Sequence, residues 1–403
     1  MYQIDFIKST FSANDFHFAR VPEIYFGTGK FKIIEELLSK FGKRILIVTG
    51  AKSFTTSKYW DLLVAALKKR SISWNHIVVK GEPSPDFIDE ECEKYRGESI
   101  DAVLAIGGGS TLDSGKAISG MLLQNNPIVD YLEGVGKGIE FNGNKIPFIA
   151  VPTTSGTGSE ATKNAVLSHV KKNGFKKSIR HNSLIPDITL VDPELMLSCP
   201  KKVTAACGMD AFTQLLEAYV SNNSSPITDT IAYHGLEYIK DNLEPSATTQ
   251  SRNIRVRSRM AYASLLSGIT LANAGLGLVH GLASPIGGMF DIPHGVVCGS
   301  LLGAATEANI NKLKNSDTTP STLMKYAKVG ALFSDLKCED VEQCCKTLVD
   351  KISELSRKLK IPLLSEYGIK EKDFRKIIEK TGHKNNPIKF KHDEIYEILK
   401  KCI

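Results

Sequence analysis

Short apolar runs alternate with longer amphipathic stretches in the first half of the chain. The apolar runs are Ile45–Thr49, His76–Val79, Ala102–Ile106, Pro147–Val151 and Ile188–Val191, and segments with helical periodicity lie near Trp60–Lys69 and Ile88–Tyr95. Such an alternation is typical of parallel strands joined by crossover helices. We therefore expect an N-terminal α/β domain with a parallel sheet and flanking helices.

The second half of the chain has a different pattern. After Asp192-Pro193 the strand signals fade, and helical periodicity runs through Val203–Ser221, Asp229–Asn242, Ile254–Ala272, Pro320–Leu332 and Val341–Leu359. We expect an all-α C-terminal domain, which divides the chain into residues 1–197 and 198–403. Two closely packed domains leave a cleft between them, where ligands commonly bind.

One stretch of the second half resembles a membrane span by length alone. Met260–Phe290 contains 31 residues without Lys, Arg, Asp or Glu, which is long enough to cross a bilayer. Several glycines, Pro285, Asn273 and His280 interrupt it, however, and this composition is too polar and too broken for a helix that faces lipid. We expect buried helices of a globular core, with no membrane association.

Composition and cysteine usage narrow the classes of function. The 403 residues include 51 Lys and Arg against 44 Asp and Glu, a net charge of +7 without a dense basic cluster, which argues against nucleic-acid binding. The eight cysteines show no C-x-x-C spacing, and the segment from Met1 to Asp5 lacks the basic-then-apolar pattern of a signal peptide. We expect free thiols and a cytoplasmic location.

A glycine turn follows the apolar run Ala102–Ile106. Gly107, Gly108, Gly109 and Ser110 come directly after it, and Thr111-Leu112-Asp113 opens a helical stretch that continues to Met121. Glycines let backbone N–H groups approach a diphosphate, and the helix N-terminus adds its positive dipole end. The spacing differs from G-x-G-x-x-G, so a purely structural tight turn remains an alternative at this point.

A second loop rich in glycine and hydroxyl groups follows the run Pro147–Val151. It reads Pro152-Thr-Thr-Ser-Gly-Thr-Gly-Ser-Glu160. Small side chains and hydroxyls suit contacts with phosphate or ribose. Two such loops at neighbouring strand ends would line one groove, and a dinucleotide is its natural occupant.

Candidate metal ligands lie in the second half. His280 and His294 lie on either side of Asp291, which is the one charged residue among the 47 from Met260 to Thr306. Asp210 and Gln214 are four residues apart near the start of the first long helix, so they project from one helix face and could point at one cation. Hydrogen-bonded core histidines and an ordinary first-turn acid remain the alternatives to a metal site.

Taken together, these motifs resemble the iron-containing (group III) alcohol dehydrogenase family. The resemblance rests on Gly107–Asp113 with Lys116, the loop Pro152–Glu160, Gly208-Met-Asp210, and His280 followed by Pro293-His294-Gly295, and it covers nearly the whole chain. It implies an α/β nucleotide-binding domain followed by a helical metal-binding domain. The family pattern places metal ligands at Asp210, Gln214, His280 and His294, with Asp210, His280 and His294 as the catalytic set.

The resemblance also exposes departures from the family pattern. Gln214 stands where the family has a histidine ligand, so its amide oxygen is either a weaker neutral ligand or is replaced by a water. Ser284 stands where many members carry another histidine facing the substrate, which weakens any histidine proton relay. The metal is expected to be one divalent cation, Fe²⁺ or Zn²⁺.

The cofactor implied by the resemblance is NADP or NAD. The strand Ile45–Thr49 runs into Gly50-Ala-Lys-Ser53, where relatives that prefer NAD tend to place an acid, so we favour NADP. The expected cofactor contacts are Gly50, Ser53, Ser84, Gly107, Gly108, Gly109, Ser110, Asp113, Thr153, Thr154, Thr157, Thr162 and Lys176.

The implied activity is hydride transfer between nicotinamide C4 and a small alcohol or aldehyde. The resemblance also favours a homodimer or a higher homo-oligomer.

Two alternatives to the dehydrogenase activity are kept. One is a lyase similar to dehydroquinate synthase, which uses metal and NAD without net redox change, although its pattern lacks the loop Pro152–Glu160. The other is a catalytically impaired nucleotide-binding relative, motivated by Gln214 and Ser284.

Overall fold

The computed structural model describes residues 15–316, 320–334 and 340–403, and the expectations that concern the segment Met1–Asp5 and Cys338 lie outside these residues. The larger sheet in the described part has six parallel strands in the order β1-β8-β5-β4-β2-β3. The strands are β1 (Glu23–Phe26), β2 (Arg44–Gly50), β3 (Ser73–Val79), β4 (Ala102–Gly107), β5 (Phe148–Pro152) and β8 (Ile188–Val191). The expected parallel sheet is confirmed, and the short strand β1 is an addition to it.

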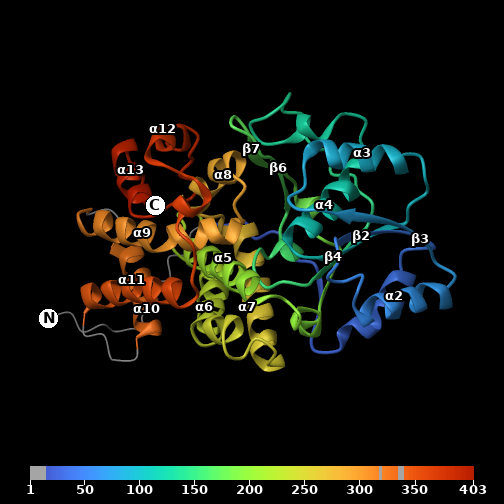
Figure 1. Cartoon of the computed structure of the whole chain (residues 1–403), viewed down its shortest axis with the longest axis horizontal. Helices are drawn as coiled ribbons and strands as arrows, with labels where there is room; N and C mark the ends of the chain where they lie inside the picture. Colours follow the sequence, from blue (N-terminus) through green and yellow to red (C-terminus); the bar gives the residue numbers. More distant parts are fainter. Residues whose placement is uncertain (1–14, 317–319, 335–339) are drawn as a thin grey trace.

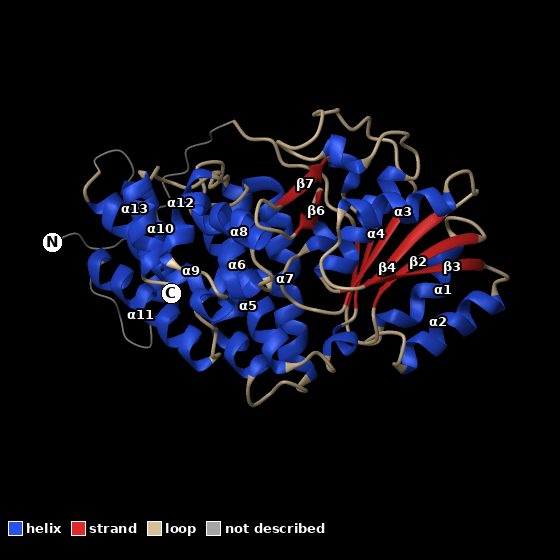
Figure 2. Ribbon diagram, turned by 45° about the horizontal axis from the view of Figure 1, so that its top comes forward, coloured by secondary structure: helices blue, strands red, loops and turns tan. Residues whose placement is uncertain are grey.

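Helices cover both faces of this sheet (Figures 1 and 2). They are α1 (Ile34–Ser39), α2 (Lys58–Lys69), α3 (Pro85–Tyr95) and α4 (Gly109–Met121). In β2, Ile45 and Ile47 belong to a core shared with α1 and α2, whereas Leu46 and Val48 belong to a core shared with α3 and α4. Because successive strand residues point to opposite faces, an almost continuous apolar run supplies both cores.

A small antiparallel hairpin lies apart from the main sheet. It consists of β6 (Asn164–His169) and β7 (Phe175–Arg180). It packs against α4 on one side and α8 (Leu278–Met289) on the other, between the two halves of the molecule (Figure 1). Sequence analysis missed this hairpin because β7 is polar and basic and lacks a strong apolar strand pattern.

The second half is helical. Besides α8, its helices are α5 (Lys201–Tyr219), α6 (Pro226–Ala247), α7 (Ile254–Ala274), α9 (His294–Lys314), α10 (Pro320–Phe333), α11 (Val341–Lys358), α12 (Glu371–Glu379) and α13 (His392–Lys400). One large apolar core joins them. The expected helical second domain is therefore confirmed, and the uncharged stretch Met260–Phe290 forms most of α7 and all of α8.

The described helices were also compared with the requirements of a bilayer span. None of them alone is long and apolar enough to cross a membrane. Helices α7 and α8 meet the requirement only as a pair, and the chain bends by 99° between them.

Short 3₁₀ segments connect the elements, and one of them marks the passage between the halves. These segments are Lys30–Ile33, Ile128–Tyr131, Ser159–Ala161, Asn182–Leu184, Pro193–Met196 and Leu364–Tyr367. We propose that the domain boundary falls at 197/198, between the segment Pro193–Met196 and α5. The seven cysteines in the described residues are all free thiols.

Candidate metal and cofactor site

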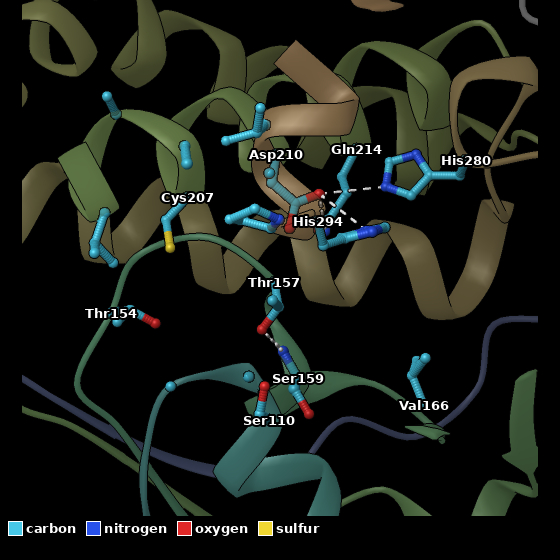
Figure 3. Close-up of a pocket in the computed structure, with 18 of the residues that line it drawn as sticks. Ser110, Thr154, Thr157, Ser159, Val166, Cys207, Asp210, Gln214, His280 and His294 are labelled. Atoms are coloured by element: carbon cyan, nitrogen blue, oxygen red, sulfur yellow. Dashed lines mark hydrogen bonds and ion pairs between the residues drawn. The ribbon is translucent and has the colours of Figure 1, made fainter. Parts of the chain in front are cut away.

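A cavity of about 1200 Å³ lies between the α/β half and the helical half. Its lining brings together Ser110 in the first turn of α4, Thr157 in the loop after β5, and the metal candidates Asp210, His280 and His294 (Figure 3). Ordinary small-molecule pockets measure about 300–1,000 Å³. This cavity therefore has room for a dinucleotide and a small substrate together.

The glycine turn forms the floor of the cavity. β4 ends at Gly107 and α4 begins at Gly109, with Gly108 at the N-cap and no side chain bonded to the helix end. A Cβ at Gly107 would lie 2.5 Å from Thr111, and one at Gly109 would lie 2.5 Å from Thr157. Packing inside the protein thus requires both of these glycines.

Gly108 differs from its two neighbours. A Cβ there would meet only the side chain of Thr154, with Oγ1 at 3.4 Å and Cγ2 at 3.5 Å, and its φ of −79° suits any residue. Gly108 and Ser110 line the cavity at the helix N-terminus, where backbone N–H groups lack helical partners. The absent side chain at Gly108 therefore leaves space for a ligand rather than for the protein.

The loop Pro152–Glu160 contacts the helical half through its glycines and the cavity through its side chains. Gly156 packs on α5, since its Cβ would lie 2.6 Å from Cys207 Cβ, and Gly158 packs on α7, since its Cβ would lie 2.4 Å from the backbone nitrogen of Gly268. Gly158 also has a φ of 61°, which favours glycine. The glycines join the two halves, while the side chains of Thr154 and Thr157 remain on the cavity wall.

A buried lysine ties the two loops together. Lys116 Nζ donates to Ser159 O and Thr162 Oγ1 at 2.8 Å each, and to Asn164 O at 2.9 Å. Its ammonium lies 3.8 Å from the Asp113 carboxylate, and Ser159 Oγ also donates to that carboxylate. Burial lowers the pKa of Lys116 to about 8 and raises the pKa of Asp113. Asp113 and Thr162 thus line the cavity but already have partners in the protein.

The remaining expected cofactor residues divide into two groups. Lys176 lines the cavity, and its Nζ pairs with Glu82 Oε2 at 2.7 Å. Five others do not line it: Gly50, Ser53, Ser84, Gly107 and Thr153. Ser84 instead caps α3 by accepting a hydrogen bond from Phe87 N.

Gly50 nevertheless lies beside the glycine turn. It ends β2, which is paired with β4, and a Cβ on it would lie 3.5 Å from Thr111 Oγ1. Ser53 is exposed in the turn that follows β2. Both residues are therefore at the carboxyl edge of the parallel sheet, the edge where nucleotides bind in open α/β sheets.

The metal candidates converge from three helices. Asp210 lies in α5, His280 in the first turn of α8, and His294 is the first residue of α9. Asp210 Oδ1 lies 3.3 Å from His280 Nε2 and 3.7 Å from His294 Nε2 (Figure 3). One carboxylate oxygen and two imidazole nitrogens thus face a common point, as ligands of Fe²⁺ or Zn²⁺ do.

The electrostatics of the cluster favour a positive charge. Burial opposes ionisation of Asp210, but the imidazoles of His294 and His280 hold the pKa of Asp210 below its ordinary value. Burial also opposes protonation of His280, but Cys298, Asp210 and Glu217 raise its pKa well above the ordinary value. Burial lowers the pKa of His294 to about 4, which leaves a neutral imidazole. Buried carboxylates beside a neutral imidazole are a donor set that fits a divalent cation.

Sequence analysis missed Glu217, which orients His280. Glu217 Oε2 lies 2.7 Å from His280 Nδ1, and Glu217 Oε1 accepts from Val279 N at 2.6 Å. Metal-binding histidines usually donate their second ring N–H to such a carboxylate, which fixes the tautomer. The spacing could have revealed it, because Asp210, Gln214 and Glu217 share one face of α5.

The two residues that depart from the family pattern are both engaged. Gln214 Nε2 donates to Asp210 Oδ1 at 3.1 Å, and Gln214 Oε1 accepts from Ser267 Oγ at 2.8 Å. Ser284 Oγ donates to the backbone oxygen of Lys176 at 2.6 Å. In this arrangement Gln214 positions the Asp210 carboxylate, and Ser284 lines the cavity without a free proton to offer.

A fourth donor atom, also missed by sequence analysis, belongs to Cys298. It lies one turn after His294 in α9, and its Sγ is 3.7 Å from Nε2 of His280 and 3.7 Å from Nε2 of His294. Burial raises the pKa of its thiol to about 11. The i, i+4 spacing from His294 was the available signal, but cysteine is so often a buried apolar residue that the spacing alone says little.

Comparison with known proteins identifies the family. Residues 22–193 match the model of iron-containing alcohol dehydrogenases, and residues 204–403 match the C-terminal model of the Fe-containing alcohol dehydrogenase family. Alcohol dehydrogenase 4 of Schizosaccharomyces pombe is 34% identical over 368 residues, which cover 90% of this chain and 82% of that protein. The NADPH-dependent butanol dehydrogenase of Clostridium saccharobutylicum is 31% identical over 94% of this chain and 96% of that protein.

A solved structure agrees with these matches. The crystal structure of a 1,3-propanediol oxidoreductase is 30% identical, superposes with a TM-score of 0.86, and covers 97% of this chain and 100% of that one. The chain belongs to the iron-containing alcohol dehydrogenase family, and it is an NAD(P)-linked alcohol dehydrogenase of the kind that uses a divalent metal. This confirms the dehydrogenase interpretation over the lyase alternative.

Proposed function

We propose that this enzyme reduces a small aldehyde with NADPH, or oxidises the corresponding alcohol with NADP, at a cation held by Asp210, His280 and His294. One observation carries the proposal. A helix N-terminus suited to a diphosphate and a converging carboxylate and imidazole cluster line the same cavity. A dinucleotide bound at the turn then has its nicotinamide end within the same cavity as the cation.

The roles of the residues follow from their contacts. Backbone N–H groups at Gly109 and Ser110 bind the cofactor diphosphate, with the hydroxyls of Thr154 and Thr157 on the wall beside it. Glu217 holds His280 in one tautomer, and Gln214 holds the Asp210 carboxylate in place. When bound, the divalent cation supplies a Lewis acid for the substrate oxygen.

Proton transfer in this enzyme does not involve a histidine at position 284. Ser284 Oγ donates its hydrogen to the backbone oxygen of Lys176, so this hydroxyl is committed to the protein. We propose that the substrate proton leaves through water or a ribose hydroxyl of the cofactor. Hydroxyl groups on the cavity wall, such as those of Ser110, Thr154 and Thr157, can accept hydrogen bonds from such a water.

The preference for NADP rests on the edge of the sheet near Gly50. No carboxylate stands at that residue to repel a 2′-phosphate, and the exposed Lys52 and Ser53 follow it. A carboxylate at the end of this strand would bind the ribose 2′-hydroxyl of NAD instead. One relative is named an NADPH-dependent butanol dehydrogenase, which agrees with this proposal.

The experiment is a reductase assay with a panel of small aldehydes. Metal-stripped enzyme is reloaded with Fe²⁺ or Zn²⁺, and the loss of reduced-nicotinamide absorbance is followed with NADPH and with NADH. We expect turnover only after metal is restored, and a higher kcat/KM with NADPH. Full activity in metal-free enzyme, or a higher kcat/KM with NADH, would contradict the respective part of the proposal.

A further inference from the structure

Cys298 is placed where a metal ligand would be. The donor atoms of Asp210, His280, His294 and Cys298 all lie within 4.8 Å of one another in the described residues. In each of the two imidazoles, Nε2 faces Asp210 Oδ1. The sulfur of Cys298 approaches these same two nitrogens. Each imidazole therefore points one atom at a centre that the carboxylate and the thiol share.

The nitrogen to oxygen and nitrogen to sulfur separations are close to those around one tetrahedral centre, and all four donor atoms lie within 4.8 Å of one another. Zinc binds imidazole nitrogen at about 2.0–2.1 Å, carboxylate oxygen at about 2.0–2.2 Å and thiolate sulfur at about 2.3 Å. Tetrahedral angles then place nitrogen about 3.4 Å from oxygen and about 3.6 Å from sulfur. The nitrogen to oxygen distances here are 3.3 and 3.7 Å, and both nitrogen to sulfur distances are 3.7 Å.

Gln214 does not take the fourth position in this arrangement. Its amide nitrogen, which cannot bind a cation, points at Asp210, and its amide oxygen accepts a hydrogen bond from Ser267. Turning the amide over would set its oxygen against Oδ1 of Asp210 and remove the hydrogen bond that Nε2 donates to that carboxylate. The amide of Gln214 is therefore engaged with Asp210 and Ser267, whereas the sulfur of Cys298 faces both imidazoles.

The surroundings also accommodate the extra negative charge of a thiolate. Lys384 lines the same cavity and interacts electrostatically with both Glu217 and Cys298. A divalent cation offsets two of the negative charges of Asp210, Glu217 and a thiolate at Cys298, and Lys384 in its charged form would offset the third. Buried charges need such compensation.

We propose that Cys298 is the fourth protein ligand of this cation, as a thiolate, and that it makes the site select Zn²⁺ over Fe²⁺. The inference rests on the proposed metal site and specifies its chemistry. On binding, the thiol loses its proton to water and a sulfur to metal bond forms, with no change in oxidation state. A soft thiolate among imidazole ligands is a donor set of zinc sites, whereas harder oxygen and nitrogen sets discriminate less. Zinc can expand to five ligands in catalytic sites, which would leave a position for the substrate oxygen beside these four donors.

The first experiment substitutes Co²⁺ for the native metal and records the absorption spectrum. A thiolate bound to Co²⁺ gives an intense near-ultraviolet charge-transfer band in addition to the weak visible bands of the ion. We expect this band in the wild type and its loss in Cys298→Ser, with cobalt still bound by elemental analysis. Cys207→Ser is the matched control, because Cys207 lines the same cavity but is outside the four-residue cluster.

The outcomes separate the two levels of the proposal. If the wild type binds no cobalt, the metal site itself is wrong. If the wild type binds cobalt with visible bands but no charge-transfer band, the metal site stands and the role of Cys298 is refuted. A band that disappears in Cys207→Ser and persists in Cys298→Ser would likewise refute it.

The second experiment measures selectivity and needs no activity assay. Apo enzyme is incubated anaerobically with equal Zn²⁺ and Fe²⁺, and bound metals are determined by elemental analysis. The ratio of zinc to iron should fall about tenfold from wild type to Cys298→Ser. An unchanged ratio would overturn the claim about selectivity.

If the variant does not fold, the wild type alone still decides the question. X-ray absorption of the zinc-loaded wild-type enzyme should show a sulfur scatterer at about 2.3 Å. A shell of nitrogen and oxygen without sulfur would overturn the assignment of Cys298.

Discussion

The cofactor end and the metal end of the cavity are prepared for their ligands in different ways. At the cofactor end, Lys116 and Asp113 already satisfy each other and the neighbouring loop, and what remains for a ligand is the backbone of the glycine turn and hydroxyls on the cavity wall. At the metal end, Asp210, His280 and His294 point their donor atoms at one another. The first end is held together by contacts within the protein, and the second concentrates buried charge that a cation balances.

The largest effect on metal content and turnover is expected from removing the two imidazoles at the metal end. In His280→Ala/His294→Ala we expect no bound metal and a fall in turnover of about three orders of magnitude or more, since a Lewis acid supplies several kcal/mol of stabilisation. Elemental analysis and the aldehyde assay measure the two effects. NADPH binding, measured by fluorescence titration, should change little. Full metal occupancy in the double variant would refute the cluster as the metal site.

The corresponding change at the cofactor end is Gly108→Val. Its side chain would extend into the cavity where the diphosphate binds, so the Kd for NADPH should rise about 100-fold through lost charge-assisted hydrogen bonds. Metal content should stay at the wild-type level. Gly382→Ala is the control, since a Cβ at Gly382 would meet no atom within 4 Å. An unchanged Kd in folded Gly108→Val would remove the turn from the cofactor site.

A smaller effect is expected at Glu217, which touches the cluster only through His280. Glu217→Gln keeps the shape of the side chain but removes the carboxylate that orients the imidazole, so Zn²⁺ affinity should fall about 10- to 100-fold. Competition with a chromophoric chelator measures it. Glu237→Gln is the control, because Glu237 pairs with the exposed His234 away from the cavity. Equal zinc affinity in wild type and Glu217→Gln would mean that His280 is held in place without this contact.

The smallest effect concerns cofactor choice. Gly50→Asp places a carboxylate at the end of β2, and its repulsion of the 2′-phosphate should shift the ratio of kcat/KM for NADPH and NADH about tenfold towards NADH. Steady-state kinetics with both cofactors test this, with Gly50→Asn as the neutral control. If both variants shift the ratio equally, charge at this position does not set the preference.

Local hydrophobic patterns predicted most of the helices and strands. The buried strands of the parallel sheet are near-continuous apolar runs, and β2, β4, β5 and β8 lie within a residue or two of their predicted bounds. The polar strand β7 was missed because its stability comes from pairing with β6 and packing against α8, which no local pattern encodes. The same holds for Gly156 and Gly158, since their need for glycine comes from helices far along the chain.

Residue types and their order along the chain were enough to indicate the family, the two-part architecture and the candidate ligands Asp210, His280 and His294. The further donors around these candidates became visible only in the folded protein. Glu217 and Cys298 lie 63 and 18 residues from His280, and they meet it because three helices cross at one point. A donor set depends on distances between atoms on separate helices, and these distances exist only after the helices have packed.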